Sequence, residues 1–405
     1  MKIADVCEFY SENGGGVRTY IRQKLAAGAR AGVSNIIIAP GAEDREEPTS
    51  GGKIVWVKAP KHPLDSRYHV FWDAEPVHKV LDREAPDVVE GSSAWRGGWI
   101  AARWPGPAIK SFFIHQDPVA VYPQTLLRGV LRPDRIDQLF GWFWAYMRKL
   151  SARFDVSVVS GHWLAERLAG FGLDRPVAVP FGIDGDAFSP LRRSEAVRRA
   201  MLAECGVTDP NAALLVAVSR HHPEKRLGTL FKALRRLQSD RAVGLYVIGD
   251  GPIRSWVEGQ AAKTPGVFIA GNIWDRAELA NKLASADAML HGGAAETYGL
   301  VVAEALASGL PLIVPDQGGA ADLAGPDYAE LYAAGDAAAC AAAVSRMLAR
   351  DRGLVSRAAL EGARKRLRRP EDHFQELFSV YARLVEDRFG GRVPGYASVV
   401  TADAA

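Results

Sequence analysis

The chain has 405 residues, of which 48% are hydrophobic and 24% are charged, a balance typical of a soluble globular protein with two ordinary domains. Its formal net charge of +3 is too small to indicate nucleic-acid binding. The three cysteines, Cys7, Cys205 and Cys340, lie far apart and match no disulfide framework or zinc site, so we expect a reducing, cytoplasmic setting. The first residues have the pattern of a strand rather than a signal peptide, and no apolar run reaches the roughly 18 residues of a membrane span.

In the first part of the chain, short aliphatic runs alternate with helical segments. The predicted strands are 2–9, 35–39, 53–57, 87–90, 108–113 and 155–160. Between most of them lie periodic segments, such as 17–32, that predict helices. This rhythm indicates a parallel sheet with helices on both faces.

A segment rich in Gly, Asp and Pro, residues 180–190, interrupts the rhythm, which then resumes. The later predicted strands are 213–219, 243–249, 266–271, 287–290 and 310–315. An amphipathic helix is predicted over 370–389, with Pro370 at its start.

These elements predict an α/β protein of two doubly wound domains, residues 1–185 and 190–370. The helix over 371–389 and a surface tail over 390–405 complete the chain. Open parallel sheets bind ligands at the carboxyl ends of their strands, so two facing domains predict a cleft there.

Three glycines, Gly14 to Gly16, follow the first strand and lead into a helix. Glycines allow close backbone approach, and a helix N-terminus attracts anions, so Gly15 and Gly16 are candidates for phosphate binding. Thr19 breaks the dinucleotide fingerprint G-x-G-x-x-G, and a simple tight turn is the equal alternative.

The loop SRHHPEKR (219–226) follows the first strand of the second domain. Arg220 and Lys225 could hold a diphosphate by charge-assisted hydrogen bonds. The alternative is a solvated basic loop with ordinary surface charges.

His115 and Asp117 stand at the end of the apolar run 108–113 and its continuation, where a reacting group would be contacted. The alternative is a structural histidine that bonds to the backbone.

The segment GGAAETYGLVVAEALASGLP (292–311) places two glutamates eight positions apart. Glu304 lies in an apolar helix that ends at Gly309, where a carboxylate needs a partner such as a ribose hydroxyl. Glu296 precedes that helix, and the first N–H groups, from Tyr298, Gly299 and Leu300, lack partners within it. The alternative is one surface glutamate and one paired with an arginine.

Together these motifs resemble the retaining glycosyltransferases of family 4, which have the GT-B fold of two Rossmann-like domains facing a cleft. The motifs that carry the resemblance are E-x7-E at Glu296 and Glu304, SRHHPEKR, GDGP (249–252), PFGID (180–184) and GGGVRTY (14–20), in the expected order. They extend over nearly the whole chain. The resemblance implies an N-terminal acceptor-binding domain, a C-terminal nucleotide-sugar-binding domain and a final helix that crosses back to the N-terminal domain.

The resemblance also implies a donor site built from both domains. Its residues would be Gly15, Gly16, Arg220, Lys225, Asn272, Ile273, Glu296, Tyr298, Gly299, Leu300 and Glu304. By resemblance Arg220 and Lys225 bind the diphosphate, Glu304 accepts from the ribose, and Glu296 holds the sugar. Asn272 and Ile273 flank the nucleobase. His115 contacts the donor sugar, and the catalytic set is His115, Arg220, Lys225 and Glu296.

Three features depart from the family pattern. Tyr298 stands where phenylalanine is commoner, Trp274 is unusual after Ile273, and residues 291–296 replace a lead-in that typically contains Pro and Ser. These departures affect the identity of the donor more than the fold.

The expected reaction moves a hexose from a UDP- or GDP-sugar to a lipid or glycan acceptor at the cytoplasmic face of a membrane. Arg220, Lys225 and a helix N-terminus can stabilise the leaving diphosphate without a metal. No Asp-x-Asp motif follows a cleft strand, so we expect metal-independent transfer with retained configuration and no cofactor, the nucleotide-sugar being a substrate. Domain closure should exclude water.

Residues 125–154 combine clustered aromatics with many basic residues. Such a segment can lie in the interface of an anionic membrane, which would make the protein peripheral at the inner face of the plasma membrane. The alternatives are a core helix with a basic outer edge and an aromatic wall of the acceptor site.

Three other functions compete with transfer. A dehydrogenase is disfavoured because two glycine motifs fail the fingerprint G-x-G-x-x-G, with Thr19 and Arg254 in place of the last glycine. A sugar-nucleotide epimerase of the same fold and an inactive sugar-nucleotide-binding regulator stay open, although the intact set of site residues argues against the latter.

Overall fold

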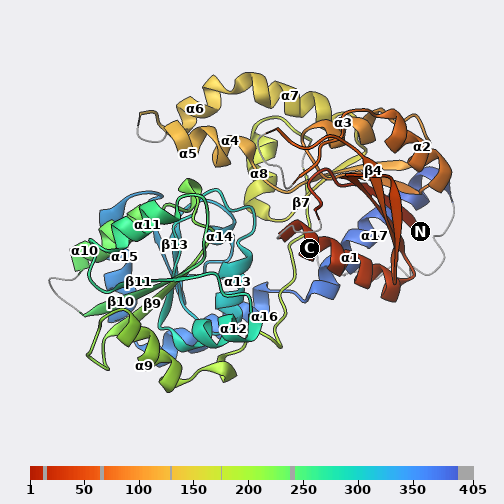
Figure 1. The fold of residues 1–405 in the computed structure, drawn as a ribbon. Coiled ribbons are helices and arrows are strands. Elements are labelled where there is room, and N and C mark those ends of the chain that lie inside the picture. The colour runs from red at the N-terminus through yellow and green to blue at the C-terminus, as the bar shows by residue number, and fades with distance from the viewer. Residues whose placement is uncertain (12–15, 64–67, 128–129, 175, 238–241, 391–405) are drawn as a thin grey trace.

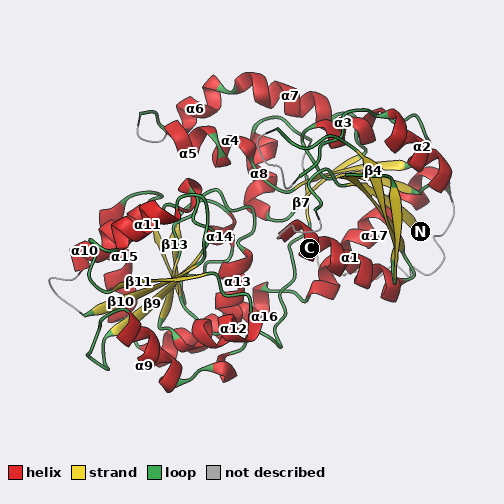
Figure 2. Cartoon of the chain, viewed as in Figure 1, coloured by secondary structure: helices red, strands yellow, loops and turns green. Residues whose placement is uncertain are grey.

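The computed structural model describes residues 1–11, 16–63, 68–127, 130–174, 176–237 and 242–390. Two separate sheets organise these residues, and helices surround each sheet (Figure 2). The predicted α/β fold with two Rossmann-like domains is therefore confirmed.

Among the described residues, the first sheet has eight strands in the order β3-β4-β2-β1-β5-β6-β7-β8. The strands are β1 (Lys2–Val6), β2 (Ser34–Gly41), β3 (Arg45–Thr49), β4 (Gly52–Lys58), β5 (Val88–Gly91), β6 (Ile109–Ile114), β7 (Val156–Val159) and β8 (Val177–Ala178). Strand β3 pairs antiparallel with β4, and the other pairs are parallel. The sequence pattern missed β3, which is exposed and strongly charged, and β8, which has only two residues.

The helices that accompany this sheet are α1 (Gly16–Ala31), α2 (Glu75–Glu84), α3 (Arg96–Arg103), α4 (Pro118–Val121), α5 (Pro123–Leu127), α6 (Pro133–Leu139), α7 (Gly141–Ser151) and α8 (His162–Gly170). The helix predicted over 17–32 is α1. It begins at Gly16, the last glycine of the motif, so its N-terminus lies at the carboxyl end of β1, where the sheet faces the second domain.

The second sheet has six parallel strands in the described residues, in the order β11-β10-β9-β12-β13-β14. They are β9 (Ala213–Val218), β10 (Val243–Ile248), β11 (Val267–Gly271), β12 (Ala288–Leu290), β13 (Leu312–Pro315) and β14 (Ala329–Tyr332). Their helices are α9 (Glu195–Glu204), α10 (Leu227–Leu237), α11 (Arg254–Ala261), α12 (Arg276–Ser285), α13 (Leu300–Ala307), α14 (Gly319–Asp322), α15 (Ala337–Ala349) and α16 (Arg352–Arg366), with 3-10 turns η1 (Pro190–Arg192) and η2 (Pro223–Lys225). Only β14 was missing from the predicted strands.

The last helix, α17 (Pro370–Phe389), returns to the first domain, as the resemblance implied. It lies beside α1, so the blue end of the chain meets the red beginning in Figure 1. Phe374, Leu377 and Tyr381 of this helix share one buried cluster with Ile3 and Phe113 of the first sheet. The C-terminal helix is therefore part of the core of the N-terminal domain.

The two passages of chain between the domains run side by side. Gly182 and Arg368 form an isolated parallel bridge, and the Ile183 N–H donates to the Arg368 carbonyl over 2.7 Å. A Cβ atom at Gly182 would lie 2.2 Å from the backbone of Arg369, so only glycine fits this crossing.

A buried charged cluster fixes α1 and α17 against the first sheet. Lys24 Nζ lies 3.0 Å from Asp5 Oδ2 and 2.7 Å from Glu90 Oε1, and all three side chains are almost fully buried. The Tyr381 hydroxyl donates to the other Glu90 oxygen and lies 2.9 Å from Ser111 Oγ. Burial raises the pKa of Glu90 to about 7, against the opposing effect of Lys24.

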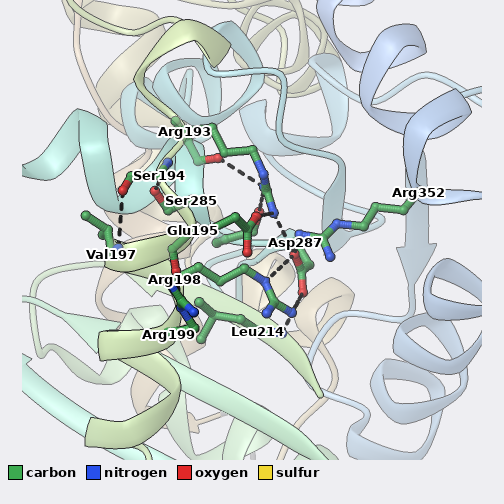
Figure 3. A network of polar contacts seen from close by, with 12 residues as sticks. Arg193, Ser194, Glu195, Val197, Arg198, Arg199, Leu214, Ser285, Asp287 and Arg352 are labelled. Carbon is green, nitrogen blue, oxygen red and sulfur yellow. Dashed lines mark hydrogen bonds and ion pairs between the residues drawn. The ribbon is translucent and has the colours of Figure 1, made fainter. Parts of the chain in front are cut away.

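A second ionic network closes the amino end of the second sheet (Figure 3). Asp287 accepts from Arg198 Nη2 and from the Leu214 N–H, each over 2.9 Å, and it is paired with Arg193 and Arg352 as well. These contacts join α9 and α16 to the start of β9, at the end of the sheet opposite the cleft described below.

None of the helices in the described part of the chain combines the length and apolarity that crossing a bilayer requires.

Candidate functional site

A cleft of about 1060 Å³ opens at the carboxyl ends of the second sheet. Phe9, Gly16 and Val17 of the N-terminal domain also line it, so both domains contribute. This is where doubly wound sheets bind ligands, because the strand ends leave backbone groups and loop side chains free to face one another.

The lining groups follow neighbouring strands, which sets their order along the cleft. Glu296 comes after β12, Arg220 after β9, Asp250 after β10, and Asn272 and Trp274 after β11. These four strands are adjacent in the sheet, in that order. The cleft is therefore a row, with a carboxylate at one end, a guanidinium near the middle and an exposed indole at the other end.

Glu296 is held by two basic groups. Its Oε1 lies 2.6 Å from Lys225 Nζ and 3.4 Å from His291 Nε2. Burial by itself raises the pKa of Glu296, but Lys225 and His291 outweigh it, and the net shift is far below the usual value. The carboxylate is therefore ionised and fixed in position. The pKa of Lys225 is raised as well, because Glu296 and Glu224 outweigh the effect of its burial.

His291 is a site residue that the sequence analysis did not propose. It directly follows β12 and is almost fully buried. A polar residue at the carboxyl end of an apolar strand was the signal that could have identified it, and the same signal was used for His115.

Helix α13 presents an uncapped N-terminus to the cleft. Its N-cap residue, Gly299, has φ of 87°, a left-handed conformation that favours glycine, and no side chain caps the helix. Tyr298, Leu300 and Val301 line the same part of the cleft. The Tyr298 hydroxyl is buried, and burial raises its pKa to about 12, so what this turn can offer an anion is its backbone N–H groups.

Glu304 is paired with an arginine in this structure. Its Oε1 lies 3.2 Å from Arg276 Nη2, and both residues line a smaller adjoining cavity of about 390 Å³. Burial raises the pKa of Glu304, and Arg276 offsets part of this shift. Of the alternatives open at the sequence level, the arginine pair is thus present, and it does not prevent the carboxylate from facing a cavity.

His115 lines the smaller cavity rather than the large cleft. Its ring stacks on Phe113 at 4.3 Å between centroids, and its carbonyl accepts from Thr297 Oγ1 over 3.0 Å, which links the two domains. Burial lowers the pKa of His115 to about 4, so the imidazole is neutral at physiological pH.

Asp117 has a structural role instead of the reactive one considered for it. It is fully buried, caps α4 by accepting from Val119 N and Ala120 N, and pairs with Arg167. A buried carboxylate with all these partners has no free capacity for a substrate.

The structure brings most of the predicted donor site together. The large cleft is lined by Gly16, Arg220, Lys225, Asn272, Ile273, Glu296, Tyr298, Gly299 and Leu300. Glu304 and His115 line the smaller cavity, which shares Gly16, Val17, Phe181 and Leu300 with the large cleft. Gly15 lies outside the described residues.

Comparison with known proteins now decides the family. Residues 14–186 match Glycosyltransferase Family 4, and residues 212–350 match Glycosyl transferases group 1. A GDP-mannose-dependent alpha-mannosyltransferase of Mycolicibacterium smegmatis is 30% identical over 369 residues, which cover 88% of this chain and 92% of the relative. The chain belongs to glycosyltransferase family 4.

Other relatives of this glycosyltransferase agree. A GDP-mannose-dependent alpha-(1-6)-phosphatidylinositol dimannoside mannosyltransferase of Mycobacterium tuberculosis is 29% identical over 317 residues, 78% of this chain and 79% of the relative. Among solved structures, a sucrose-phosphate synthase from Thermosynechococcus elongatus aligns with a TM-score of 0.75 at 19% identity, over 96% of this chain and 100% of that chain. The expected GT-B fold is thereby confirmed, and the chain is a hexosyltransferase that uses a nucleotide-sugar.

In this glycosyltransferase, the described part of residues 125–154 has one face in the core and one face exposed to solvent. Phe143 and Trp144 are buried in a core cluster, and the Tyr146 hydroxyl donates to the Ala94 carbonyl over 2.7 Å. By contrast, the side chain of Trp142 is 67% exposed. Large aliphatic side chains in this segment are exposed as well, such as that of Leu126, which is 77% exposed. The core interpretation holds for the inner face of α7, and the outer face of α5 to α7 exposes the apolar Leu126, Leu139 and Trp142 among charged residues such as Arg135 and Lys149.

Proposed function

We propose that this glycosyltransferase transfers mannose from GDP-mannose, with retained configuration, to a lipid acceptor of the phosphatidylinositol class. Relatives that match most of this chain are GDP-mannose-dependent mannosyltransferases, and one of them acts on phosphatidylinositol dimannoside. Of the two nucleobases left open by the sequence, this favours guanine.

The donor would lie along the row of groups in the cleft. Glu296, fixed by Lys225 and His291, accepts hydrogen bonds from mannose hydroxyls. Arg220, Lys225 and the N-terminus of α13 hold the diphosphate, with Gly16 approaching it from the other domain. Glu304 accepts from the ribose in competition with Arg276. The single observation that carries the proposal is this alternation of a fixed carboxylate and cationic groups along one cleft.

In the proposed reaction, the bond between the anomeric carbon and the phosphate oxygen breaks through an oxocarbenium-like state. The acceptor oxygen bonds to the same face of the sugar, and its proton passes to the departing phosphate oxygen. Arg220, Lys225 and the α13 N-terminus stabilise the growing charge on the diphosphate, so we propose that no metal is needed. His115 is neutral and acts by contact with the sugar.

The names of the relatives support retention of configuration. Mannose is α-linked in GDP-mannose, and two of the relatives form α-mannosides by name. Glu296 is a poor nucleophile because Lys225 Nζ, 2.6 Å away, stabilises its charge, which favours same-face transfer over a covalent intermediate.

We further propose that the protein works at the cytoplasmic face of a membrane as a peripheral protein. The exposed Leu126, Leu139 and Trp142 of α5 to α7, with basic residues such as Arg135 and Lys149 exposed on the same helices, would approach the bilayer that contains the acceptor. The C-terminal domain would then hold the donor close to the lipid acceptor.

The decisive test has two steps. Thermal-shift screening against UDP- and GDP-sugars should single out GDP-mannose, and transfer to phosphatidylinositol lipids should then give an α-mannoside by NMR. Conversion of the sugar nucleotide without any acceptor would instead indicate the epimerase, and stabilisation by none of the donors would overturn the proposal.

A further inference from the structure

We propose that Trp274 stacks on the nucleobase of the donor and selects a purine. The inference rests on the proposed function, because it assumes a nucleoside diphosphate donor in the cleft. It concerns a side chain that is not among the donor-site residues expected from the family resemblance.

The side chain of Trp274 is unusually exposed to solvent. Its side chain is 87% exposed, which makes it the most exposed of the ten tryptophans in the chain, and within the described residues it is the only tryptophan that lines the cleft. An indole left open to water gains nothing for stability, so an exposed one on a cleft wall indicates binding.

The backbone holds Trp274 rigidly in this position. The next residue, Asp275, is the N-cap of α12, and its Oδ1 accepts from Ala277 N over 2.8 Å. The preceding residue, Ile273, is half-buried and packs against the core cluster of the domain. The backbone of Trp274 is thus anchored between a helix cap and a core contact, and its exposed indole can meet a ligand.

The order of the strands places Trp274 at the nucleoside end of the donor. The sugar-holding Glu296 follows β12, the phosphate-binding Arg220 follows β9, and Trp274 follows β11, two strands farther along the sheet. Neighbouring strands are about 4.8 Å apart, so the indole stands roughly 10 Å beyond the diphosphate site. A ribose spans part of that distance, which leaves the base beside Trp274.

The chemistry of this end suits a flat, polar-edged ring. An indole face attracts a nucleobase by stacking, and the gain grows with the area of contact, so the two fused rings of a purine gain more than the single ring of a pyrimidine. Asn272, exposed on the same wall, carries both a donor and an acceptor that can reach the edge of the base.

Trp256 provides a matched control. It lies on α11 of the same domain and is 49% exposed, but it does not line the cleft. Replacing either tryptophan by alanine removes one indole, and only Trp274→Ala removes it from the proposed base site.

The test compares Trp274→Ala, Trp274→Phe and Trp256→Ala with the unmodified protein. For a GDP-sugar, Trp274→Ala should raise the donor KM about tenfold with kcat little changed, because stacking contributes equally to ground and transition states. Trp274→Phe should restore most of the loss, and Trp256→Ala should have no effect. The KM for the matching UDP-sugar should rise by less, about threefold.

A second measurement does not depend on turnover. GDP should quench the tryptophan fluorescence of the unmodified protein and of Trp256→Ala, and should quench Trp274→Phe much less. If Trp274→Ala has the same donor KM and the same affinity for GDP as the unmodified protein, and the unmodified protein transfers sugar, then Trp274 does not bind the nucleobase and the proposed function stands. If the unmodified protein binds no nucleoside diphosphate at all, both proposals are overturned.

Discussion

Lys225 and Glu296 are 71 positions apart in the sequence, yet Lys225 Nζ lies 2.6 Å from Glu296 Oε1 at the carboxyl edge of the second sheet. The pair joins the loop after β9 to the loop after β12. Because the two strands are neighbours, the contact places a fixed carboxylate next to a cation where sugar and diphosphate would meet.

Lys225→Ala should lower kcat/KM for the donor by at least about a hundredfold, because the diphosphate loses a cation and Glu296 loses the group that holds it. Affinity for GDP, measured by calorimetry, should fall in parallel. Lys232→Ala, which removes an exposed lysine from the adjacent α10, is the control and should change neither quantity. If both variants bind GDP with equal affinity, Lys225 does not bind the diphosphate.

Glu304→Gln should weaken donor binding through the ribose. The neutral amide accepts more weakly than a carboxylate, so we expect a loss of about tenfold in affinity for GDP. If the loss comes from the ribose, 2′,3′-dideoxy-GDP should bind the unmodified protein and Glu304→Gln equally.

The matched control for this variant is Glu278→Gln on α12, since Glu278 is exposed and lies away from the cavities. A loss that is just as large with the dideoxy nucleotide would contradict the ribose assignment and point to the broken pair with Arg276 instead.

The outer face of α5 to α7 should bind anionic membranes. Replacing Leu126, Leu139 and Trp142 by serine removes three exposed apolar side chains, so co-sedimentation with phosphatidylinositol-containing vesicles should drop several-fold. Leu354→Ser, at an exposed position on α16, serves as the control. If the unmodified protein does not bind the vesicles, or if its binding does not depend on salt, this surface does not contact anionic membranes.

Two buried histidines should make stability fall in mild acid. Burial lowers the pKa of both His115 and His373 to about 4, from about 6.5 in an unfolded chain. The unfolded state therefore binds protons first as the pH falls. The stabilisation is complete above about pH 6.5 and is lost progressively towards pH 4.

The variant His373→Gln tests this dependence through the slope of its melting temperature against pH. Its melting temperature should fall less steeply between pH 6.5 and 4 than that of the unmodified protein, although the lost contacts to Pro180 and Tyr20 lower it at neutral pH. His162→Gln, at an exposed position, should keep the original slope. Parallel slopes for all three proteins would show that His373 does not titrate differently on folding.

The strand and helix patterns in the sequence were largely sufficient to predict the fold. Aliphatic runs such as 35–39 and 243–249 could be located because strands buried on both faces are continuously apolar. The helix over 370–389 is confirmed as α17. The sequence pattern missed β3 because an exposed edge strand of charged residues has no continuous apolar run. It missed β14 because that strand has only four residues and Glu330 interrupts its apolar run.

The candidate site was predicted as residue types after strands, and its partners were not. Nothing in the sequence could pair Glu304 with Arg276, bring His291 to Glu296 or pair Asp117 with Arg167, because each contact depends on the three-dimensional path of loops and helices. The family resemblance supplied the order of the motifs, which made the donor site recognisable before its geometry was known.

The sequence by itself determined the two parallel sheets, the family and the set of polar residues at the strand ends, because these depend on local patterns along the chain. Only the tertiary structure decided the order β11-β10-β9-β12, which arranges Trp274, Arg220 and Glu296 along one cleft. Sheet order and side-chain burial arise from long-range packing, and that packing sets the charge of Glu296 and leaves Trp274 exposed.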